Sequence, residues 1–288
     1  MKTSMKFILF LMLASIAITT TYASAANKES LSNTAPKLSV QLWSVRNHIA
    51  EDFDATIDAL ARMGFDGVEL AGDFGKFTDD PKGLTAFIKS KGLEVSGAHV
   101  DFNSLSDDKF VETINFYKAA DVPMLIIGYD TRAGSSDTIE QTIADLNRIA
   151  PRVEAHGIRF GYHNHDFEFA PFGEATFWDH IAKSTPNSLV LQMDVGWVNH
   201  AGADPIEYVR RYAGRTLSTH YKIKFNNPII GQDSFDWAGL YKVNTEVGGT
   251  QWIVLEQEEY PEGLTPLESV RLSKQGLAKA LISVSMSN

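Results

Sequence analysis

Residues 160–169 read FGYHNHDFEF. Apolar side chains alternate through Ile158, Phe160 and Tyr162, and this alternation indicates a β-strand with one buried face. Side chains of the metal-binding or proton-transferring type follow within the next positions: His163, His165, Asp166 and Glu168. Such side chains at the end of a strand suggest a site at the mouth of a sheet. A polar loop with two hydrogen-bonded histidines is the alternative.

Alternating strand and helix patterns fill the rest of the chain. Residues 124–128 (MLIIG) are entirely apolar, as buried parallel strands tend to be. Phe110, Ile114 and Tyr117 have the spacing of one helix face. The expected strands cover 38–43, 67–70, 93–99, 124–128, 159–163, 189–194, 217–222 and 252–256. The expected helices cover 52–63, 81–91, 107–120, 137–156, 176–184, 205–212, 237–247 and 267–284.

This order of elements predicts an α/β fold. Eight strand–helix units in about 250 residues are typical of a single (β/α)8 barrel, the TIM barrel, with a parallel eight-stranded core. An open doubly wound sheet is the alternative, but it usually has a glycine-rich nucleotide turn after the first strand. The segment in that position, 44–52 (SVRNHIAED), has no glycine. We therefore expect one TIM-barrel domain over residues 37–288.

Composition excludes several classes of function. The chain has 288 residues, of which 44% are hydrophobic and 22% charged, as in ordinary globular proteins. Its formal net charge of −10 disfavours a nucleic-acid surface, which needs clustered lysines and arginines. The absence of cysteine excludes disulfides, zinc–thiolate sites and thiol nucleophiles.

The first residues have the pattern of a signal peptide. Lys2 and Lys6 precede an apolar run at 7–18, which is too short to span a bilayer, and Ala23-Ser24-Ala25 offers a cleavage site. We expect a signal peptide at 1–25, cleaved near Ala25, and a polar leader at 26–36. The mature protein is then periplasmic or secreted in a bacterium and free of the membrane. An uncleaved anchor is the alternative.

Polar residues at the ends of the expected strands suggest an active site, because barrel enzymes place theirs at the carboxyl ends of the strands. Glu69 alone could pair with a lysine, and His99 alone could be a hydrogen-bonded core histidine. Asp194, His220 and Glu256 together indicate a metal site. The complete set is Glu69, His99, His163, His165, Asp194, His220, Lys222, Glu256 and Glu258.

Six stretches connect the chain with a known family: QLWSVR (41–46), GFDGVEL (64–70), GYHNHDFEF (161–169), LQMDVGWVNHAGADP (191–205), THYK (219–222) and WIVLEQEEY (252–260). Together they resemble the xylose-isomerase-like TIM-barrel superfamily of sugar and sugar-phosphate isomerases and epimerases. The resemblance covers 37 to about 282. It implies one divalent-cation ligand from each of strands five to eight: His163, Asp194, His220 and Glu256.

Two positions depart from the family pattern. Many members have a glutamate where this chain has His163, and those enzymes shuttle a proton between two facing glutamates. The segment after Lys222 usually continues into an aspartate, whereas here it reads Ile223-Lys224-Phe225-Asn226. Two histidines with two carboxylates suit Mn²⁺, Fe²⁺, Co²⁺ or Zn²⁺ better than Mg²⁺ or Ca²⁺.

The expected chemistry is removal of the proton α to a carbonyl. A cation could hold a sugar hydroxyl and carbonyl and stabilise the enediolate that forms. Glu256 is the first candidate for the base, with His99, Glu69 or His165 as its partner. Trp43, Trp197 and Phe225 could stack on a sugar ring, and the family's pocket positions include Arg46 and Tyr260. Further candidate substrate contacts are Glu168, Lys222 and Glu258.

Four functions compete at this point. The first is a metal-dependent sugar isomerase or epimerase. The second is a lyase or hydratase that expels a β-oxygen from a 3-keto-sugar or 3-keto-glycoside, which export and the missing glutamate both favour. The third is an apurinic endonuclease, which would need a basic groove for DNA. The fourth is a non-catalytic sugar-binding protein, in which the four ligand-type residues would have come together by chance. The expected partner is a small carbohydrate, and a homo-oligomer is possible.

Overall fold

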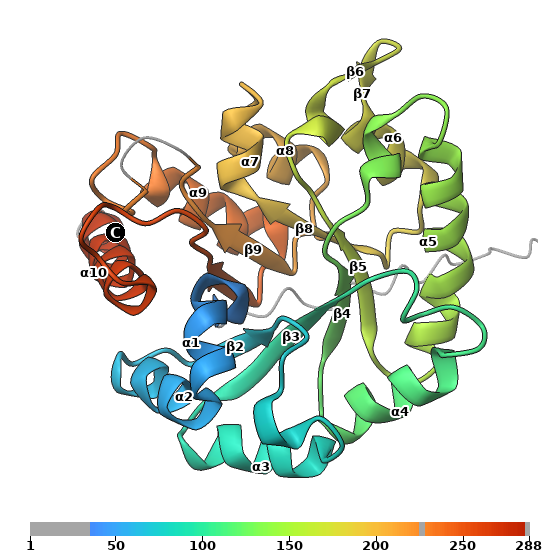
Figure 1. Ribbon diagram of the computed structural model, residues 1–288. Coiled ribbons are helices and arrows are strands. Elements are labelled where there is room, and N and C mark those ends of the chain that lie inside the picture. The colour runs from blue at the N-terminus through green and yellow to red at the C-terminus, as the bar shows by residue number, and fades with distance from the viewer. Residues whose placement is uncertain (1–34, 225–227, 286–288) are drawn as a thin grey trace, which may run out of the picture. The chain divides into compact units, whose positions relative to one another are not determined.

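The computed structural model describes residues 35–224 and 228–285, which form a closed barrel of parallel strands ringed by helices (Figure 1). The barrel strands are β1 (Lys37–Gln41), β2 (Gly67–Leu70), β3 (Glu94–Val100), β4 (Met124–Ile127), β5 (Arg159–His163), β8 (Val190–Asp194), β9 (Ser218–Tyr221) and β10 (Trp252–Leu255). β1 closes the barrel, because Val40 lies opposite Val68 of β2 and Leu255 of β10. The predicted (β/α)8 barrel is confirmed.

The helices pack around the outside of the barrel and connect successive strands (Figure 1). Phe110, Ile114 and Tyr117 are all buried, as their spacing predicted. The helices are α1 (Arg46–Glu51), α2 (Phe53–Arg62), α3 (Pro81–Ser90), α4 (Phe110–Ala119), α5 (Ile139–Glu154), α6 (Phe177–Ser184), α7 (Val195–His200), α8 (Pro205–Arg211), α9 (Trp237–Val243) and α10 (Pro266–Ser285).

Apolar side chains close the barrel at its amino-terminal end. Met124, Val190 and Trp252 are the first residues of their strands, and they form an inner cluster with Ile126 and Val254. The larger apolar cluster contains the strand residues packed against the helices. This arrangement leaves the carboxyl ends of the strands as the open, polar end of the barrel.

Two glycines make room for the inner cluster. A Cβ atom on Gly161 would lie 2.6 Å from Cδ1 of Ile126, and one on Gly67 would lie 2.9 Å from the Trp252 ring. Real Cβ atoms essentially never approach so closely, so a larger residue at either position would displace the neighbouring side chain. Glycine is therefore required there for close packing inside the barrel.

The structure differs from the predicted elements in short segments. α1 and α7 were not predicted, and neither was the hairpin of β6 (Pro171–Phe172) and β7 (Ala175–Thr176). The predicted helix at 237–247 is α9 followed by a π-helical turn at Asn244–Gly248. α7 follows β8 without a loop, because the Asp194 side chain accepts a hydrogen bond from the Trp197 amide and begins the helix. A helix of two turns is too short for a periodic pattern.

The predicted signal peptide at 1–25 and most of the predicted leader at 26–36 lie outside the described residues, as does Phe225. Within the described part of the chain, no helix is long and apolar enough to cross a membrane.

A buried carboxylate joins α6 to the end of α8. The Asp179 carboxylate accepts hydrogen bonds from the Thr176 amide at 3.1 Å, from Arg211 Nη1 at 3.0 Å and from the Tyr212 hydroxyl. Burial alone would raise the pKa of Asp179, but the bonds from Tyr212, Arg211 and Thr176 outweigh it and lower that pKa. Asp179 therefore stabilises the fold in its ionised form.

We expect Asp179→Asn to lower the free energy of unfolding at pH 7 by about 1–3 kcal/mol, because the amide loses charge-assisted hydrogen bonds. A carboxyl with a lowered folded-state pKa contributes stability above its unfolded pKa and loses it as the pH falls through the folded value. The difference between wild type and variant should therefore shrink below about pH 4. Urea unfolding at pH 7 and pH 3 measures both effects.

Glu207→Gln is the matched control, because Glu207 pairs with the same Arg211 but its side chain is 60% exposed. This variant should lose less than about 1 kcal/mol. Equal losses in the two variants would contradict the role given to Asp179.

Candidate metal centre and active site

The carboxyl ends of four neighbouring strands bring two imidazoles and two carboxylates together. One ligand-type atom from each side chain lies within 4.8 Å of the others, and all four side chains are buried. His163 Nε2 is 3.6 Å from Asp194 Oδ2, and His220 Nδ1 is 3.0 Å from Glu256 Oε2. These four residues, called the ligand cluster below, are the set that the family resemblance implied: His163, Asp194, His220 and Glu256.

Asp194 is held on both its side chain and its backbone. Its Oδ1 accepts a hydrogen bond from the Trp197 amide at 3.0 Å. Asn164 fixes the strand end from β5, since its Oδ1 accepts from the Asp194 amide at 2.9 Å and its Nδ2 donates to the Asp194 carbonyl at 3.2 Å. Asp194 Oδ2 accepts no hydrogen bond from any described residue. One oxygen of this immobilised carboxylate therefore points into the ligand cluster.

Glu69 lies beneath the cluster and is completely buried. Its Oε2 accepts hydrogen bonds from His220 Nε2 at 2.6 Å and from Gln41 Nε2 at 2.7 Å. Its Oε1 accepts from Gln192 Nε2 at 2.7 Å. Glu69 does not line the cavity described below, and its role as a catalytic partner stays a prediction. Its hydrogen bonds orient Gln41, Gln192 and His220.

Gln192 determines which nitrogen of two histidines carries a proton. Its Nε2 must face Glu69, because a carboxylate can only accept. Its Oε1 therefore accepts from His163 Nδ1 at 3.0 Å and from His99 Nε2 at 2.7 Å. His163 Nε2 is left as a lone pair facing Asp194, and His99 Nδ1 as a lone pair with no described partner. Hydrogen bonds of this kind orient the histidines of metal sites.

Neighbouring charges in and around the ligand cluster shift the pKa values of its side chains. Burial alone would lower the pKa of His220, but the carboxylates of Glu69 and Glu256 raise it to about 10. Burial alone would raise the pKa of Glu256, but the Lys222 ammonium and His220 hold it well below its ordinary value. Burial raises the pKa of Asp194 to about 6, although Lys222 opposes this. Positive charge at the centre of the cluster is therefore favourable.

Lys222 supplies part of that charge from the side. Its Nζ lies 3.2 Å from Asp194 Oδ2, 3.2 Å from Glu256 Oε2 and 2.8 Å from Glu258 Oε2. The side chain is buried and its ammonium lies 5.0 Å from the centre of the Trp197 ring. Lys222 thus neutralises the carboxylates and does not line the cavity described below, and its contact with a substrate stays a prediction.

The ligand cluster fits a divalent cation. It offers the lone pair of His163 Nε2, a carboxylate of Glu256 and Asp194 Oδ2, which accepts no hydrogen bond and lies 3.2 Å from Lys222 Nζ. His220 Nδ1 would exchange its proton for the cation, while His220 Nε2 stays bonded to Glu69. Neutral imidazoles and carboxylates in this proportion are typical ligands of Zn²⁺, Mn²⁺, Fe²⁺ or Co²⁺.

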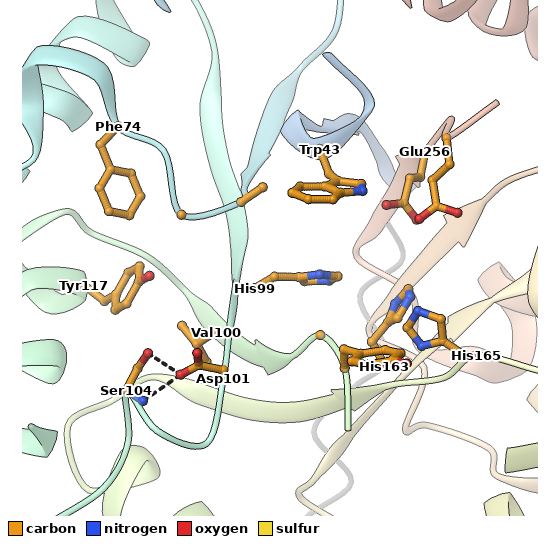
Figure 2. A pocket seen from close by; sticks show the side chains of 15 residues that line it. Trp43, Phe74, His99, Val100, Asp101, Ser104, Tyr117, His163, His165 and Glu256 are labelled. Carbon is orange, nitrogen blue, oxygen red and sulfur yellow. Dashed lines mark hydrogen bonds between the residues drawn. The ribbon is translucent and has the colours of Figure 1, made fainter. Parts of the chain in front are cut away.

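A cavity of about 630 Å³ opens above the ligand cluster (Figure 2). His99, His163, His165 and Glu256 line it, as do Trp43 and Glu258. The structure thus places four of the predicted catalytic and metal-binding residues on its wall. His165 stacks on Phe167, and burial lowers the pKa of His165 to about 3, so its imidazole is neutral.

Four predicted substrate contacts lie behind the cavity wall. The Arg46 guanidinium lies 4.7 Å from the centre of the Trp43 ring, and the Tyr260 hydroxyl donates to the Ser44 carbonyl at 2.8 Å. The Trp197 ring packs between His165 and Lys224. Glu168 is fully buried and accepts from the Tyr162 hydroxyl at 2.6 Å. These residues do not line the cavity, and their contact with a substrate stays a prediction.

The sequence patterns did not identify several residues of the site. Gln41 is the last residue of β1 and Gln192 lies in the middle of β8, and both are buried. A glutamine between two apolar residues was the available signal, in the segments QLWSVR and LQMD. Gly128 allows His99 to lie against β4, since a Cβ there would be 2.7 Å from His99 Nδ1. The cavity residues that were missed include three aromatic ones, Phe74, Tyr117 and Tyr129, which come from loops and a helix that have no motif.

The chain is similar to known proteins over most of its length. A family model described as xylose isomerase-like TIM barrel matches residues 57–279. The solved structure of a sugar phosphate isomerase/epimerase from Parabacteroides distasonis superposes with a TM-score of 0.73 and 23% identity, covering 87% of this chain and 97% of that one. This likeness establishes the fold.

Two dehydratases are also similar. The inosose dehydratase of Clostridium botulinum is 21% identical over 261 residues, which cover 75% of this chain and 85% of that protein. The structure of the probable 3-DHS dehydratase AsbF from Bacillus anthracis has a TM-score of 0.65 and 12% identity, covering 84% of this chain and 98% of that one.

We expect the purified protein to bind about one divalent cation per chain, and His220→Ala to weaken that binding by more than about 100-fold, because an imidazole ligand and its bond to Glu69 are both lost. Metal analysis after equilibration with Mn²⁺ or Zn²⁺ measures this. His165→Ala is the control and should keep its affinity within about twofold, since His165 lies outside the ligand cluster. Unchanged metal content in folded His220→Ala protein would reject the ligand set.

Proposed function

The chain belongs to the xylose isomerase-like TIM-barrel family, and from this premise we propose that it is a metal-dependent lyase or hydratase acting on keto-sugars. It removes the proton α to the carbonyl and expels an oxygen from the β-carbon. The inosose dehydratases among its relatives support this choice. A sugar isomerase or epimerase, which returns the proton to a neighbouring carbon or to the opposite face of the same carbon, is the second candidate, supported by the similarity to a sugar phosphate isomerase/epimerase.

The observation that favours elimination is the imidazole at position 163. Inversion of a carbon needs a base on one face and an acid on the other. The residue contributed by β5 is His163, whose Nδ1 is bonded to Gln192, and Glu256 is the sole glutamate of the ligand cluster. Elimination needs one residue that takes the proton and returns it to the leaving oxygen. The ligand cluster provides this residue in Glu256, but it does not provide two glutamates that face each other.

Glu256 has the geometry of the base. Its Oε2 accepts hydrogen bonds from His220 at 3.0 Å and Lys222 at 3.2 Å, whereas its Oε1 has no described partner. Because Glu256 lines the cavity, Oε1 can accept the proton from the substrate carbon. The C–H electron pair forms the enediolate, the β C–O bond then breaks, and the proton passes to the departing oxygen. The products are an unsaturated ketone and water or an alcohol.

The other cavity residues hold the substrate. His99 Nδ1 can accept a hydrogen bond from a sugar hydroxyl, because Gln192 fixes the proton on His99 Nε2. A divalent cation held by the ligand cluster would polarise the carbonyl and neutralise the developing negative charge.

The charge of the cavity favours a substrate without phosphate. The described lining residues include Asp101, Glu256 and Glu258, but no lysine or arginine. Phosphate sites in proteins use arginine, lysine or exposed amides at helix amino-termini. Neighbouring Lys222 and Lys224 are already paired with Glu258, at 2.8 and 3.4 Å. We therefore infer a neutral keto-sugar or keto-glycoside.

The reaction is tested by incubating the protein with a 3-keto-glucoside in D₂O and following proton NMR. Elimination should produce a vinylic proton signal and release the β-substituent. A chelator should abolish the reaction. Glu256→Gln should lower kcat by at least about 100-fold and keep more metal than activity, because an amide offers an oxygen but cannot accept the proton.

Glu259→Gln is the matched control and should retain full activity, because Glu259 pairs with Lys224 and does not line the cavity. Incorporation of deuterium at the α-carbon without loss of the β-oxygen would reject the lyase and support the isomerase or epimerase. Turnover by Glu256→Gln at the wild-type rate would remove Glu256 from the mechanism.

We also propose that the chain is exported, on the basis of the basic, apolar and Ala23-Ser24-Ala25 pattern. The mature protein from a bacterial host should begin at Ala26 or within a few residues of it. Amino-terminal sequencing of the periplasmic and cytoplasmic fractions measures this. Full-length protein starting at Met1 in the cytoplasm would contradict it.

A further inference from the structure

The cavity extends well beyond the ligand cluster. Figure 2 shows His163, His165 and Glu256 on one side of His99, and Phe74 and Tyr117 on the other. All of these residues line one continuous cavity. Its volume of about 630 Å³ lies in the range of roughly 300–1,000 Å³ that holds drug-sized ligands, and exceeds what one six-membered ring fills. The part beyond His99 is called the arm below.

The arm is built from the loops and helices that follow β2 and β3. Ala71, Gly72 and Phe74 follow β2, Val100 ends β3, and Tyr117 lies on α4. The rings of Phe74 and Tyr117 meet edge to face at 6.3 Å, and Phe74 is backed by Phe116 at 4.9 Å. These contacts hold the aromatic wall in place without a ligand. Ala71 and Gly72 also line this part of the cavity, and neither has a bulky side chain.

The arm offers apolar contact together with a few polar groups. The Tyr117 hydroxyl bonds to no described residue, and burial raises the pKa of Tyr117 to about 12, so the hydroxyl is a donor at neutral pH. Asp101 accepts from the Ser104 amide at 2.7 Å and is the acidic residue at this end. Aromatic faces with scattered hydroxyl donors are suited to a ring that has both apolar and polar edges.

The entrance has the same character. The side chains of Trp43 and Tyr129 are 46% and 56% exposed, which is unusual for residues of this size, and both line the cavity. The Trp43 indole is held by the Arg46 guanidinium at 4.7 Å. Exposed aromatic side chains held in place beside a site are typical of ligand contacts.

We propose that the arm is a subsite for a second ring, so that the substrate is a neutral glycoside whose second ring lies against Phe74 and Tyr117. The keto-sugar ring then occupies the side of the cavity next to the ligand cluster. This inference rests on the proposed function, since it assigns the keto-sugar to that side.

Binding separates the subsite from the reaction. Phenyl and methyl β-glucosides have no keto group and cannot undergo elimination, so calorimetry with the metal-loaded protein reports affinity alone. We expect the phenyl glucoside to bind about tenfold more tightly than the methyl glucoside, a difference of about 1.4 kcal/mol. Turnover of the corresponding 3-keto-glycosides should show the same preference in kcat/KM.

Ala71→Phe tests the position of the second ring. The added ring fills the arm without touching the ligand cluster, so the affinity for the phenyl glucoside should fall about tenfold and that for the methyl glucoside should change less than twofold. Ala71→Ser is the matched control and should bind both like the wild type. Metal content and thermal unfolding verify that both variants are intact.

The outcomes are distinct for the two proposals. Equal affinities for the two glucosides, or equal losses in Ala71→Phe, would overturn the subsite. A phenyl preference that Ala71→Phe abolishes, together with no elimination from either 3-keto-glycoside, would support the subsite and reject the proposed reaction.

Discussion

The buried carboxylate of Glu69 is the constraint on which the site depends. An ionised carboxylate without partners inside a barrel would cost several kcal/mol, so its hydrogen-bond donors must be present and correctly placed. Gln41, Gln192 and His220 provide them from three strands. Gln192 in turn orients two further side chains, because its Oε1 fixes the protons of His99 and His163. One buried charge thus sets the orientation and protonation of the histidines at the mouth of the barrel.

The layers along the barrel axis explain how this charge is tolerated. The apolar cluster around Trp252 closes one end, and the Glu69 network lies between it and the ligand cluster. Lys222 and its carboxylate partners flank the cluster, so that buried charges of both signs lie beside one another. The cavity above is acidic near Glu256 and aromatic near Phe74 and Tyr117. A substrate therefore meets prearranged polar groups at one end and a prearranged apolar surface at the other, which limits the entropy lost on binding.

The sequence predicted the ligand cluster well and the supporting residues poorly. His163, Asp194, His220 and Glu256 could be found because they stand at the ends of strands with clear apolar patterns, and parallel strands of a barrel bring those ends together. Glu69, Lys222 and Trp197 also stand at or near strand ends, yet they face other side chains and not the cavity. Sequence pattern places a residue along a strand, but does not tell which atoms its side chain reaches. Gln192 was missed for the same reason. The role of its amide depends on its hydrogen-bond partners, which are Glu69, Ser218, His163 and His99.

The sequence by itself determined the class of fold, because this follows from local periodicity and from the order of elements along the chain. The four residues of the ligand cluster were implied by the resemblance of six stretches to a known family. Only the tertiary structure decided that Glu69 bonds to Gln41, Gln192 and His220, that Gln192 sets the histidine tautomers, and that Lys222 balances the carboxylates. It also decided the shape of the cavity, since Phe74, Tyr117 and Glu256 come from segments far apart in the chain. Hydrogen bonds between distant strands and the volume enclosed by packed loops are long-range properties, and no local pattern contains them.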